Sequence, residues 1–378
     1  MKTDKTIKAL KVLVVLSNLR VSNGVASYIM NYFRKIDFHS IKMDFALYQD
    51  IETPYYDEIR KQGGKIFILP SVKSIRKHVS CCNKILQQEH YDIIHDNTLL
   101  LSYFMMYCAK KNGIPIRILH SHNSRLGETK YKEIRNKWLL PLLLNTANAY
   151  FACSDLAAQA LFGKHPYVFV PNVISVTKFS FDESIRERVR NQFHCGNKFI
   201  IGTVGRLAAQ KNPFYAIDTV IKAYEYNHNI QYWWIGSGPL MDRVRTYIKE
   251  KGATSYIRLF GSRNDIADLY QAMDLFFLPS LFEGLPVTGV EAQAMGLPCL
   301  LSDTITKEVV YTDLVTFFSI NTPAEIVSTH FMNIRHELSG EKRKKYHRLS
   351  LNSIFSDTKA GEYLLKKYCE CLYQLKIN

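Results

Sequence analysis

The sequence predicts an α/β protein made of two doubly wound domains, and two observations lead to this prediction. Short apolar segments alternate along the whole chain with segments of helical length, which is the pattern of parallel sheets covered by helices. The chain has 378 residues, which is too long for one ordinary core. Ligands bind such sheets at the carboxyl ends of the strands, so we expect the two domains to face each other across a ligand-binding cleft.

Seven apolar segments of the first half predict strands. The first, residues 11–16, follows a basic stretch as in a signal peptide, but its apolar run is too short and no cleavage site follows. No apolar run approaches eighteen residues, so we expect no transmembrane helix. The predicted strands are residues 11–16, 43–47, 65–69, 93–95, 116–119, 150–152 and 168–170.

Six further segments predict the strands of a second sheet, and a charged stretch at 182–197 separates the two series. We therefore place an N-terminal domain at 1–180 and a C-terminal domain at 181–357. Residues 358–375 carry Tyr363, Leu364, Tyr368, Cys369, Leu372 and Leu375 at helical spacing, which predicts an amphipathic helix. The strands expected in the second domain are residues 199–204, 231–235, 257–260, 275–278, 299–301 and 315–318.

Two carboxylates, Glu283 and Glu291, are the most informative residues. Glu283 follows a predicted strand in a Gly/Pro loop, and Glu291 lies on the first turns of the next helix, with Pro286 expected in its first turn and Gly296 at its end. Backbone N–H groups at the helix start would attract phosphates, and the carboxylates would accept hydrogen bonds from hydroxyls. A sugar nucleotide carries both groups.

A purely structural interpretation of the same residues is also open. Thr288 and Glu291 have the spacing of a capping box, in which Glu291 would only satisfy backbone donors. Glu283 could be a solvated acid of the loop.

The surrounding string resembles the signature of the retaining GT-B glycosyltransferases of family 4, also called glycosyl transferases group 1, of the bacterial capsular and exopolysaccharide type. That signature is E-x7-E in an E-G-x-P context, and Glu283, Gly284, Leu285, Pro286 and Glu291 match it. The resemblance implies that Glu283 contacts the transferred sugar and that Glu291 holds the ribose. It also implies the GT-B fold, with residues 358–378 packing back on the N-terminal domain.

A second string, Gly205-Arg206-Leu207 followed by Lys211-Asn212-Pro213, lies between a predicted strand and a helix. Arg206 and Lys211 could converge on a pyrophosphate there, although pairs of loop cations are common. The same string matches the resembled family, in which this Arg and Lys bind the donor diphosphate. We predict this role for both residues.

Four further residues, in three loops, are predicted to bind the donor. Gly236 and Gly238 form a second glycine turn, and in the family this loop lies close to the donor. Arg263 occupies the loop that contacts the nucleobase in the family. Gly24, after the first strand, would let the backbone approach a phosphate; Asn23 stands where many family members have another glycine.

Two histidines, His120 and His122, follow the strand predicted at 116–119. At the carboxyl end of a strand they could hydrogen-bond a sugar or acceptor, or titrate near neutral pH. By motif position His122 matches the active-site histidine of the family, and which of the two acts stays open.

We predict no metal site and no cofactor. The chain contains no D-x-D motif, and Arg206, Lys211 and helix N-termini could stabilise a leaving diphosphate without a metal. The two histidines lack a third ligand at readable spacing.

The formal charge is +15, and residues 1–175 hold 24 Lys and Arg against 13 Asp and Glu, a net +11. Basic clusters stand at 73–78 and 130–138. Such a surface would attract an anionic membrane or simply be solvated, and we expect peripheral contact with an anionic membrane through the N-terminal domain. The eight cysteines form no C-x-x-C pair, which favours a reducing, cytoplasmic setting. Together with the basic N-terminal domain, this setting suggests a location at the inner face of the membrane.

The sequence thus predicts a retaining glycosyltransferase acting on a nucleotide-sugar donor, with UDP favoured over GDP, and on a hydroxyl of a glycan or lipid-linked acceptor in surface polysaccharide biosynthesis. A sugar-nucleotide epimerase or a phosphorylase of the same fold is an alternative. A nucleic-acid-binding protein is a remote one, because no aromatic-basic RNA motif occurs and both glutamates would stay unexplained.

Overall fold

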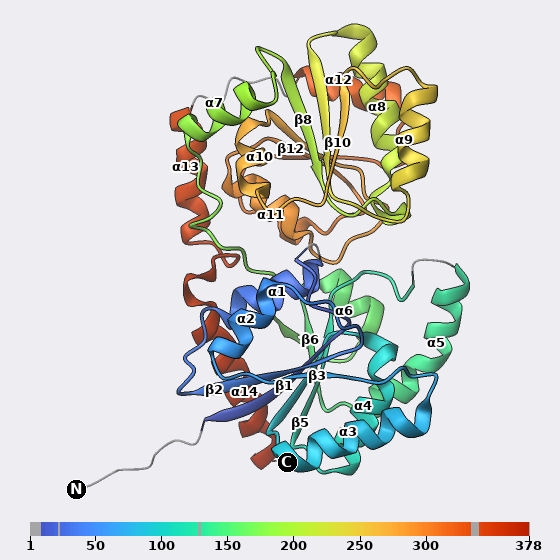
Figure 1. The fold of residues 1–378 in the computed structure, drawn as a ribbon, viewed down its shortest axis with the longest axis vertical. Coiled ribbons are helices and arrows are strands. Elements are labelled where there is room, and N and C mark those ends of the chain that lie inside the picture. The colour runs from blue at the N-terminus through green and yellow to red at the C-terminus, as the bar shows by residue number, and fades with distance from the viewer. Residues whose placement is uncertain (1–8, 22, 128–129, 334–339, 378) are drawn as a thin grey trace, which may run out of the picture. The chain divides into compact units, whose positions relative to one another are not determined.

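The computed structural model describes residues 9–21, 23–127, 130–333 and 340–377, and the chain divides into two compact units (Figure 1). Unit 1 comprises Met1–Val173 and Asp357–Asn378, and unit 2 comprises Ile174–Ser356. The division falls seven residues before the boundary that the sequence analysis placed after residue 180, and it assigns the C-terminal segment to unit 1.

Unit 1 contains a parallel sheet of seven strands in its described part, in the order β3-β2-β1-β4-β5-β6-β7. The order reverses between β1 and β4, where Val12 pairs with Ile93. All seven predicted strands are confirmed, with ends shifted by at most two residues. They are β1 (Leu10–Leu16), β2 (Ile41–Leu47), β3 (Ile66–Ile68), β4 (Ile93–Asp96), β5 (Ile116–Ser121), β6 (Ala149–Ala152) and β7 (Val168–Phe169).

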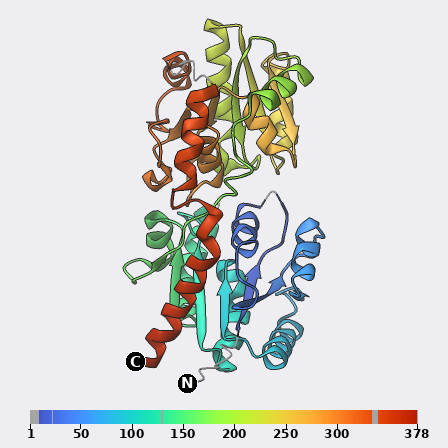
Figure 2. The ribbon, with the colours of Figure 1, turned by 90° about the vertical axis from the view of Figure 1, so that its left-hand side faces the viewer.

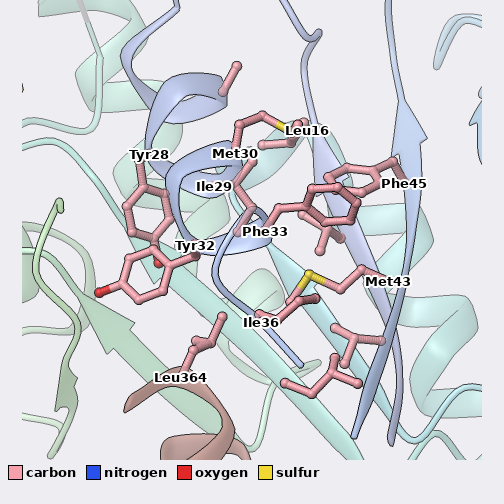
Figure 3. Packing of buried hydrophobic residues seen from close by; sticks show 14 of the residues in the cluster. Leu16, Tyr28, Ile29, Met30, Tyr32, Phe33, Ile36, Met43, Phe45 and Leu364 are labelled. Carbon is pink, nitrogen blue, oxygen red and sulfur yellow. The ribbon is translucent and has the colours of Figure 1, made fainter. Parts of the chain in front are cut away.

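Helices cover both faces of this sheet, because successive side chains of each strand point to opposite faces. Val12 and Val14 face one core, while Leu13 and Val15 face the other. Figure 3 shows part of the first core, where Tyr28 and Tyr32 pack beside Leu364. The helices are α1 (Gly24–Phe33), α2 (Pro54–Lys61), α3 (Ile75–Glu89), η1 (Leu99–Ser102), α4 (Tyr103–Lys111), α5 (Lys130–Leu144), α6 (Asp155–Phe162), η4 (Asp357–Lys359) and α14 (Ala360–Ile377).

The C-terminal helix α14 runs along unit 1, as Figure 2 shows. Leu364 and Tyr368 are buried, as the helical spacing predicts, but Cys369 is exposed and Cys371 takes the buried position. Helical spacing alone did not identify the buried face, because α14 has apolar residues on more than one side. At Gly361 a Cβ would collide with the carbonyl of Lys35, so glycine allows α14 to approach the segment that follows α1.

Unit 2 contains a second parallel sheet, with six strands in its described part and the order β10-β9-β8-β11-β12-β13. Its order reverses between β8 and β11. All six predicted strands are confirmed: β8 (Phe199–Val204), β9 (Ile230–Ile235), β10 (Ile257–Gly261), β11 (Leu275–Leu278), β12 (Cys299–Ser302) and β13 (Val315–Phe318). The helices are α7 (Glu183–Gln192), η2 (Ala209–Lys211), α8 (Pro213–Tyr226), α9 (Met241–Glu250), α10 (Ile266–Ala272), α11 (Val287–Ala294), η3 (Lys307–Val309), α12 (Ala324–Asn333) and α13 (Gly340–Leu351).

The charged stretch at 182–197 is not the boundary between the units, because its helix α7 packs within unit 2. Arg186 and Arg190 of α7 both pair with Asp274, at 2.5 and 3.2 Å. Their guanidinium groups also donate to the carbonyls of Met273 and Ala272. The charges that suggested a linker therefore hold this helix against the end of α10.

Cys108, Cys153 and Cys299 are buried, as expected of cysteines that act as small apolar side chains. Within the described residues, no helix is both long enough and apolar enough to cross a membrane.

Candidate functional site

The candidate site lies in unit 2 at the reversal of strand order, where ligands bind doubly wound sheets. The loops after β8 and β11 meet there, because these strands are neighbours in the sheet. The amide of Leu281 donates to the carbonyl of Gln210 (2.7 Å), and the Gln210 side chain donates to the carbonyl of Phe282 (3.0 Å). These bonds join two segments that are about 70 residues apart in sequence.

Lys211 and Glu283 form an ion pair at this junction, with 2.6 Å between Lys211 Nζ and Glu283 Oε1. Gln210 Nε2 donates to the other carboxylate oxygen at 3.2 Å. Glu283 is only 7% exposed, so the interpretation of it as a solvated loop acid is wrong. Each carboxylate oxygen has a second lone pair, which leaves acceptor capacity for a ligand hydroxyl.

Arg206 stands at the start of the same β8 loop and is exposed, whereas Lys211 is mostly buried. The stem of Lys211 passes close to Gly205, where a Cβ would lie 3.0 Å from Lys211 Cε. The loop therefore carries two cations in different settings, one exposed and one bound to Glu283.

The glycine turn after β9 packs on the backbone of the β8 loop. A Cβ at Gly236 would collide with the carbonyl of Gly205, and one at Gly238 with the carbonyl of Leu207. Gly236 also has φ +135°, a conformation that other residues rarely adopt. Close packing against the backbone of the β8 loop therefore requires glycine at both positions.

Arg263, in the loop after β10, forms a bidentate ion pair with Asp265 at 2.6 and 2.8 Å. The amide of Ser262 donates to Ser237 Oγ (3.0 Å), which ties this loop to the glycine turn. The loops after β8, β9 and β10 are therefore connected along one edge of the sheet.

Helix α11 begins one residue later than expected, because Pro286 is extended (ψ 108°) and occupies the N-cap position. Before it, Gly284 and Leu285 are buried in the loop. The capping-box interpretation is wrong, since Thr288 lies inside the helix and its hydroxyl is buried without a hydrogen-bond partner among the described residues. Gly296, with φ +65°, ends the helix region as predicted.

Glu291 accepts a hydrogen bond from the hydroxyl of Tyr270 (3.2 Å). Burial raises the pKa of Glu291 to about 7, although Tyr270 and Lys178 both lower it. Burial also raises the pKa of Tyr270, so its hydroxyl stays protonated and remains a donor. The Glu291 carboxyl therefore changes charge near neutral pH.

Two residues of the site, Gln210 and Tyr270, are not among the residues predicted from the sequence. Gln210 stands directly before Lys211, and its nearness to a predicted residue is the one signal that the sequence offered. Tyr270 lies on α10, 21 residues before Glu291, and no local pattern connects the two.

In unit 1, the expectation that the histidines titrate near neutral pH is wrong. His120 is buried, and its Nδ1 lies 2.9 Å from Nε2 of His95, a residue of β4 that sequence reasoning missed. His95 in turn contacts the hydroxyl of Tyr368 (2.8 Å). Burial lowers the pKa of all three histidines, to about 3 for His95 and His122. They are neutral at physiological pH.

His122 differs from His120 because it is partly exposed. Its ring stacks on His120 at 4.1 Å between centroids, and its Nε2 lies 2.8 Å from the side-chain oxygen of Asn97. His122 and Asn97 follow the neighbouring strands β5 and β4. The structure thus places a neutral, accessible imidazole at the carboxyl edge of the unit 1 sheet.

Gly24 is the first residue of α1, and the side chain of Asn23 caps this helix by accepting from the amide of Val25 (3.0 Å). A Cβ at Gly24 would meet no atom within 4 Å. Asn23 thus has a capping role where many family members have glycine.

No group of three or more His, Cys, Asp or Glu side chains in the described ranges is arranged to hold a metal ion. Metal independence stays a prediction.

Comparisons with known proteins agree with this geometry. The family model of the glycosyl transferases group 1 matches residues 198–328, which include β8–β13. The putative glycosyltransferase EpsF of Bacillus subtilis (strain 168) is 30% identical over 334 residues, covering 84% of this chain and 85% of that protein. A UDP-Gal:alpha-D-GlcNAc-diphosphoundecaprenol alpha-1,3-galactosyltransferase of Escherichia coli is 29% identical over 272 residues, covering 66% and 68%.

Among solved structures, Anabaena Alr3699/HepE in complex with UDP-glucose superimposes with a TM-score of 0.80 at 15% identity, covering 96% of this chain and all of that one. This likeness concerns the fold and confirms the predicted GT-B architecture. The length of the match to EpsF, together with the family model on unit 2, confirms the resemblance seen in the sequence. The chain therefore belongs to the glycosyl transferases group 1 family and is a glycosyltransferase of the GT-B fold.

Proposed function

We propose that this enzyme transfers a sugar from a UDP-sugar, with retention of anomeric configuration, to a hydroxyl of a lipid-linked glycan in surface polysaccharide biosynthesis. The Lys211–Glu283 ion pair at the strand reversal of unit 2 carries this proposal. It places a cation for phosphate next to a carboxylate for sugar hydroxyls, 2.6 Å apart. A donor sugar and its diphosphate have the same adjacency.

Each remaining residue has a role in the proposal. Arg206 and Lys211 bind the diphosphate, and backbone amides near Gly236, Gly238 and Pro286 approach the nucleotide. Glu291 accepts hydrogen bonds from the ribose hydroxyls.

The remaining contacts with the donor involve one side chain and the backbone of three residues. The side chain is that of Arg263, beside the base, and the backbone contacts are those of Gly24, Gly284 and Leu285.

The reaction needs no protein nucleophile in this proposal. The acceptor oxygen attacks the anomeric carbon of the donor sugar. At the same time the bond between this carbon and the phosphate oxygen breaks, and UDP leaves with the bonding electrons. The leaving phosphate oxygen takes the proton of the acceptor hydroxyl. Arg206 and Lys211 stabilise the charge that develops on the diphosphate. His122 is neutral, so we assign it a hydrogen bond to the sugar or acceptor.

Two observations support the donor and acceptor classes. The Escherichia coli relative uses UDP-Gal and a diphosphoundecaprenol acceptor, and the Anabaena fold relative binds UDP-glucose. The net charge of +11 over residues 1–175 supports peripheral contact with an anionic membrane, and hence a site of action at its cytoplasmic face.

The first test is thermal unfolding with UDP, GDP, ADP or CMP in the presence of EDTA. We expect UDP to raise the unfolding temperature of unit 2 by roughly 5–10 °C at 100 times its Kd, since bound ligand stabilises only the folded state of the unit that binds it. Transfer from a UDP-sugar should likewise survive EDTA. Complete loss of activity that Mg²⁺ restores would contradict metal independence. Conversion of the donor to its epimer in the absence of an acceptor would contradict sugar transfer and favour an epimerase.

The raised pKa of Glu291 predicts a pH-dependent donor affinity. Below about pH 7 the carboxyl is protonated, and above it the carboxylate can accept from two ribose hydroxyls. UDP affinity should therefore rise as the pH increases from 6 to 8. Glu291→Gln should abolish that part of the pH dependence, while ionisation of UDP itself affects both proteins equally. Calorimetric titration of both proteins across this range is the measurement.

The same group predicts an opposite trend in stability. Because its folded-state pKa lies above the ordinary value of 4.5, the folded state holds the proton more tightly. The contribution of Glu291 to the free energy of unfolding is therefore lost as the pH rises from 4.5 to about 7. Glu291→Gln should be more stable than the wild type at pH 8 and similar to it at pH 4.5. An equal difference in stability between the variant and the wild type at both pH values would contradict the raised pKa of Glu291.

A further inference from the structure

Helix α5 exposes a row of large apolar side chains. The exposed fractions are 76% for Tyr131, 61% for Ile134, 81% for Trp138 and 54% for Leu142. Large apolar side chains so fully exposed in one row indicate an interaction surface.

The spacing of these residues places them on one side of the helix. At 100° per residue, Tyr131, Ile134, Trp138 and Leu142 fall within about 80° of arc. The opposite side packs on the unit through Leu143, which is fully buried, and Leu140. Figure 1 shows α5 beside α4 in unit 1. The helix thus has two apolar faces, of which its own unit covers one.

Cations border the exposed row on both sides. By the same helical geometry, Lys130 and Lys137 lie on one flank, and Lys132 and Arg135 on the other. All four side chains are exposed, and Glu133 is the one acid of the helix. An apolar row with an aromatic centre and cationic flanks is the composition of helices that lie in a membrane interface.

We propose that α5 docks in the headgroup region of an anionic lipid bilayer. The row from Tyr131 to Leu142 reaches the acyl boundary, and the flanking cations bind lipid phosphates. Helix α5 follows β5 in the chain, and His122 stands directly after that strand, so this docking brings a membrane-embedded acceptor toward the unit 1 sheet edge. That last consequence rests on the proposed function, whereas the docking itself does not.

A bilayer fits this surface better than a second copy of the chain. A two-fold interface would place the same patch on itself, so the four cations of one copy would face those of the other. Like charges at that distance repel, while anionic lipid neutralises all four.

Tryptophan fluorescence reports on α5 directly. The chain has three tryptophans, and Trp233 and Trp234 are fully buried in unit 2. Phosphatidylcholine vesicles containing phosphatidylglycerol should therefore shift the emission of Trp138 to shorter wavelength. Trp138→Phe should bind the vesicles but lose the shift. Binding of the wild type with unchanged emission would overturn the proposal.

Vesicle sedimentation tests the row and its flanks separately. The double variant Ile134→Ser and Trp138→Ser should weaken binding by about tenfold or more, because two apolar side chains no longer enter the bilayer. Lys132→Gln and Arg135→Gln should each cost about fivefold at low salt. Ile326→Ser and Tyr226→Ser, exposed positions of unit 2, are matched controls and should bind as wild type. Equal binding by all variants, or a dimer that the double variant dissociates, would overturn the proposal.

An activity assay separates this inference from the proposed function. The double variant of α5 should transfer sugar normally to a short-chain, water-soluble acceptor and poorly to a long-chain acceptor in vesicles. Equal loss with both acceptors would overturn the docking role. Vesicle binding with the Trp138 shift, but no transfer to either acceptor by the wild type, would refute the proposed function and leave the membrane surface standing.

Discussion

Glu283→Gln is expected to lower turnover by about 100- to 1,000-fold, the size of effect seen when one charge-stabilising group is removed from a transition state. The carboxylate accepts from Lys211 and Gln210 and keeps lone pairs for the sugar hydroxyls. Gln presents one acceptor oxygen and one NH2 donor, so it cannot replace both oxygens. UDP without sugar should bind at least as tightly as to the wild type, because Lys211 is released from its partner.

The stability of this variant must be measured alongside its activity. Lys211 is mostly buried, and loss of its partner should lower the free energy of unfolding by roughly 1–3 kcal/mol. Urea unfolding and circular dichroism establish that the variant is folded at the assay temperature. Glu325→Gln on α12 removes an exposed carboxylate and serves as the control. A folded Glu283→Gln enzyme with wild-type turnover would refute the role of Glu283.

Lys211→Met is expected to weaken UDP binding by about 10- to 100-fold, which is the value of a charged hydrogen bond to phosphate. Its effect on UDP is thus opposite to that of Glu283→Gln, although both variants break the same ion pair. Titration calorimetry with UDP measures the difference. Lys222→Met, on the exposed face of α8, is the matched control. Unchanged UDP affinity in Lys211→Met would exclude this lysine from the diphosphate site.

The two substitutions form a double-mutant cycle. Each single variant leaves one buried charge without its partner, whereas the double variant leaves a neutral pair. The double variant should therefore be more stable than the sum of the single effects predicts, by roughly 1–3 kcal/mol. It should not recover transfer. Additive losses of stability would show that the 2.6 Å pair contributes nothing to the fold.

Much of the fold was predictable because parallel strands buried on both faces form short runs of Val, Ile, Leu and Phe. The strands Phe199–Val204, Leu275–Leu278 and Val315–Phe318 were predicted with their observed ends. The charged stretch that forms α7 was wrongly predicted to separate the two domains, because its arginines pair with Asp274, about 85 residues away in sequence. The sequence does not show whether a charged side chain is solvated or pairs with a distant residue of the same unit.

The sequence by itself determined the fold class, the position of both glutamates after the β11 strand, and the family, because these depend on local pattern and spacing. Only the tertiary structure decided that Glu283 pairs with Lys211, that Tyr270 reaches Glu291, and that His120 lies beside His95 in the core. It also decided which face of α5 meets solvent. Each of these contacts or exposures depends on how distant segments pack, and packing sets the burial that shifts a pKa or leaves an apolar row uncovered.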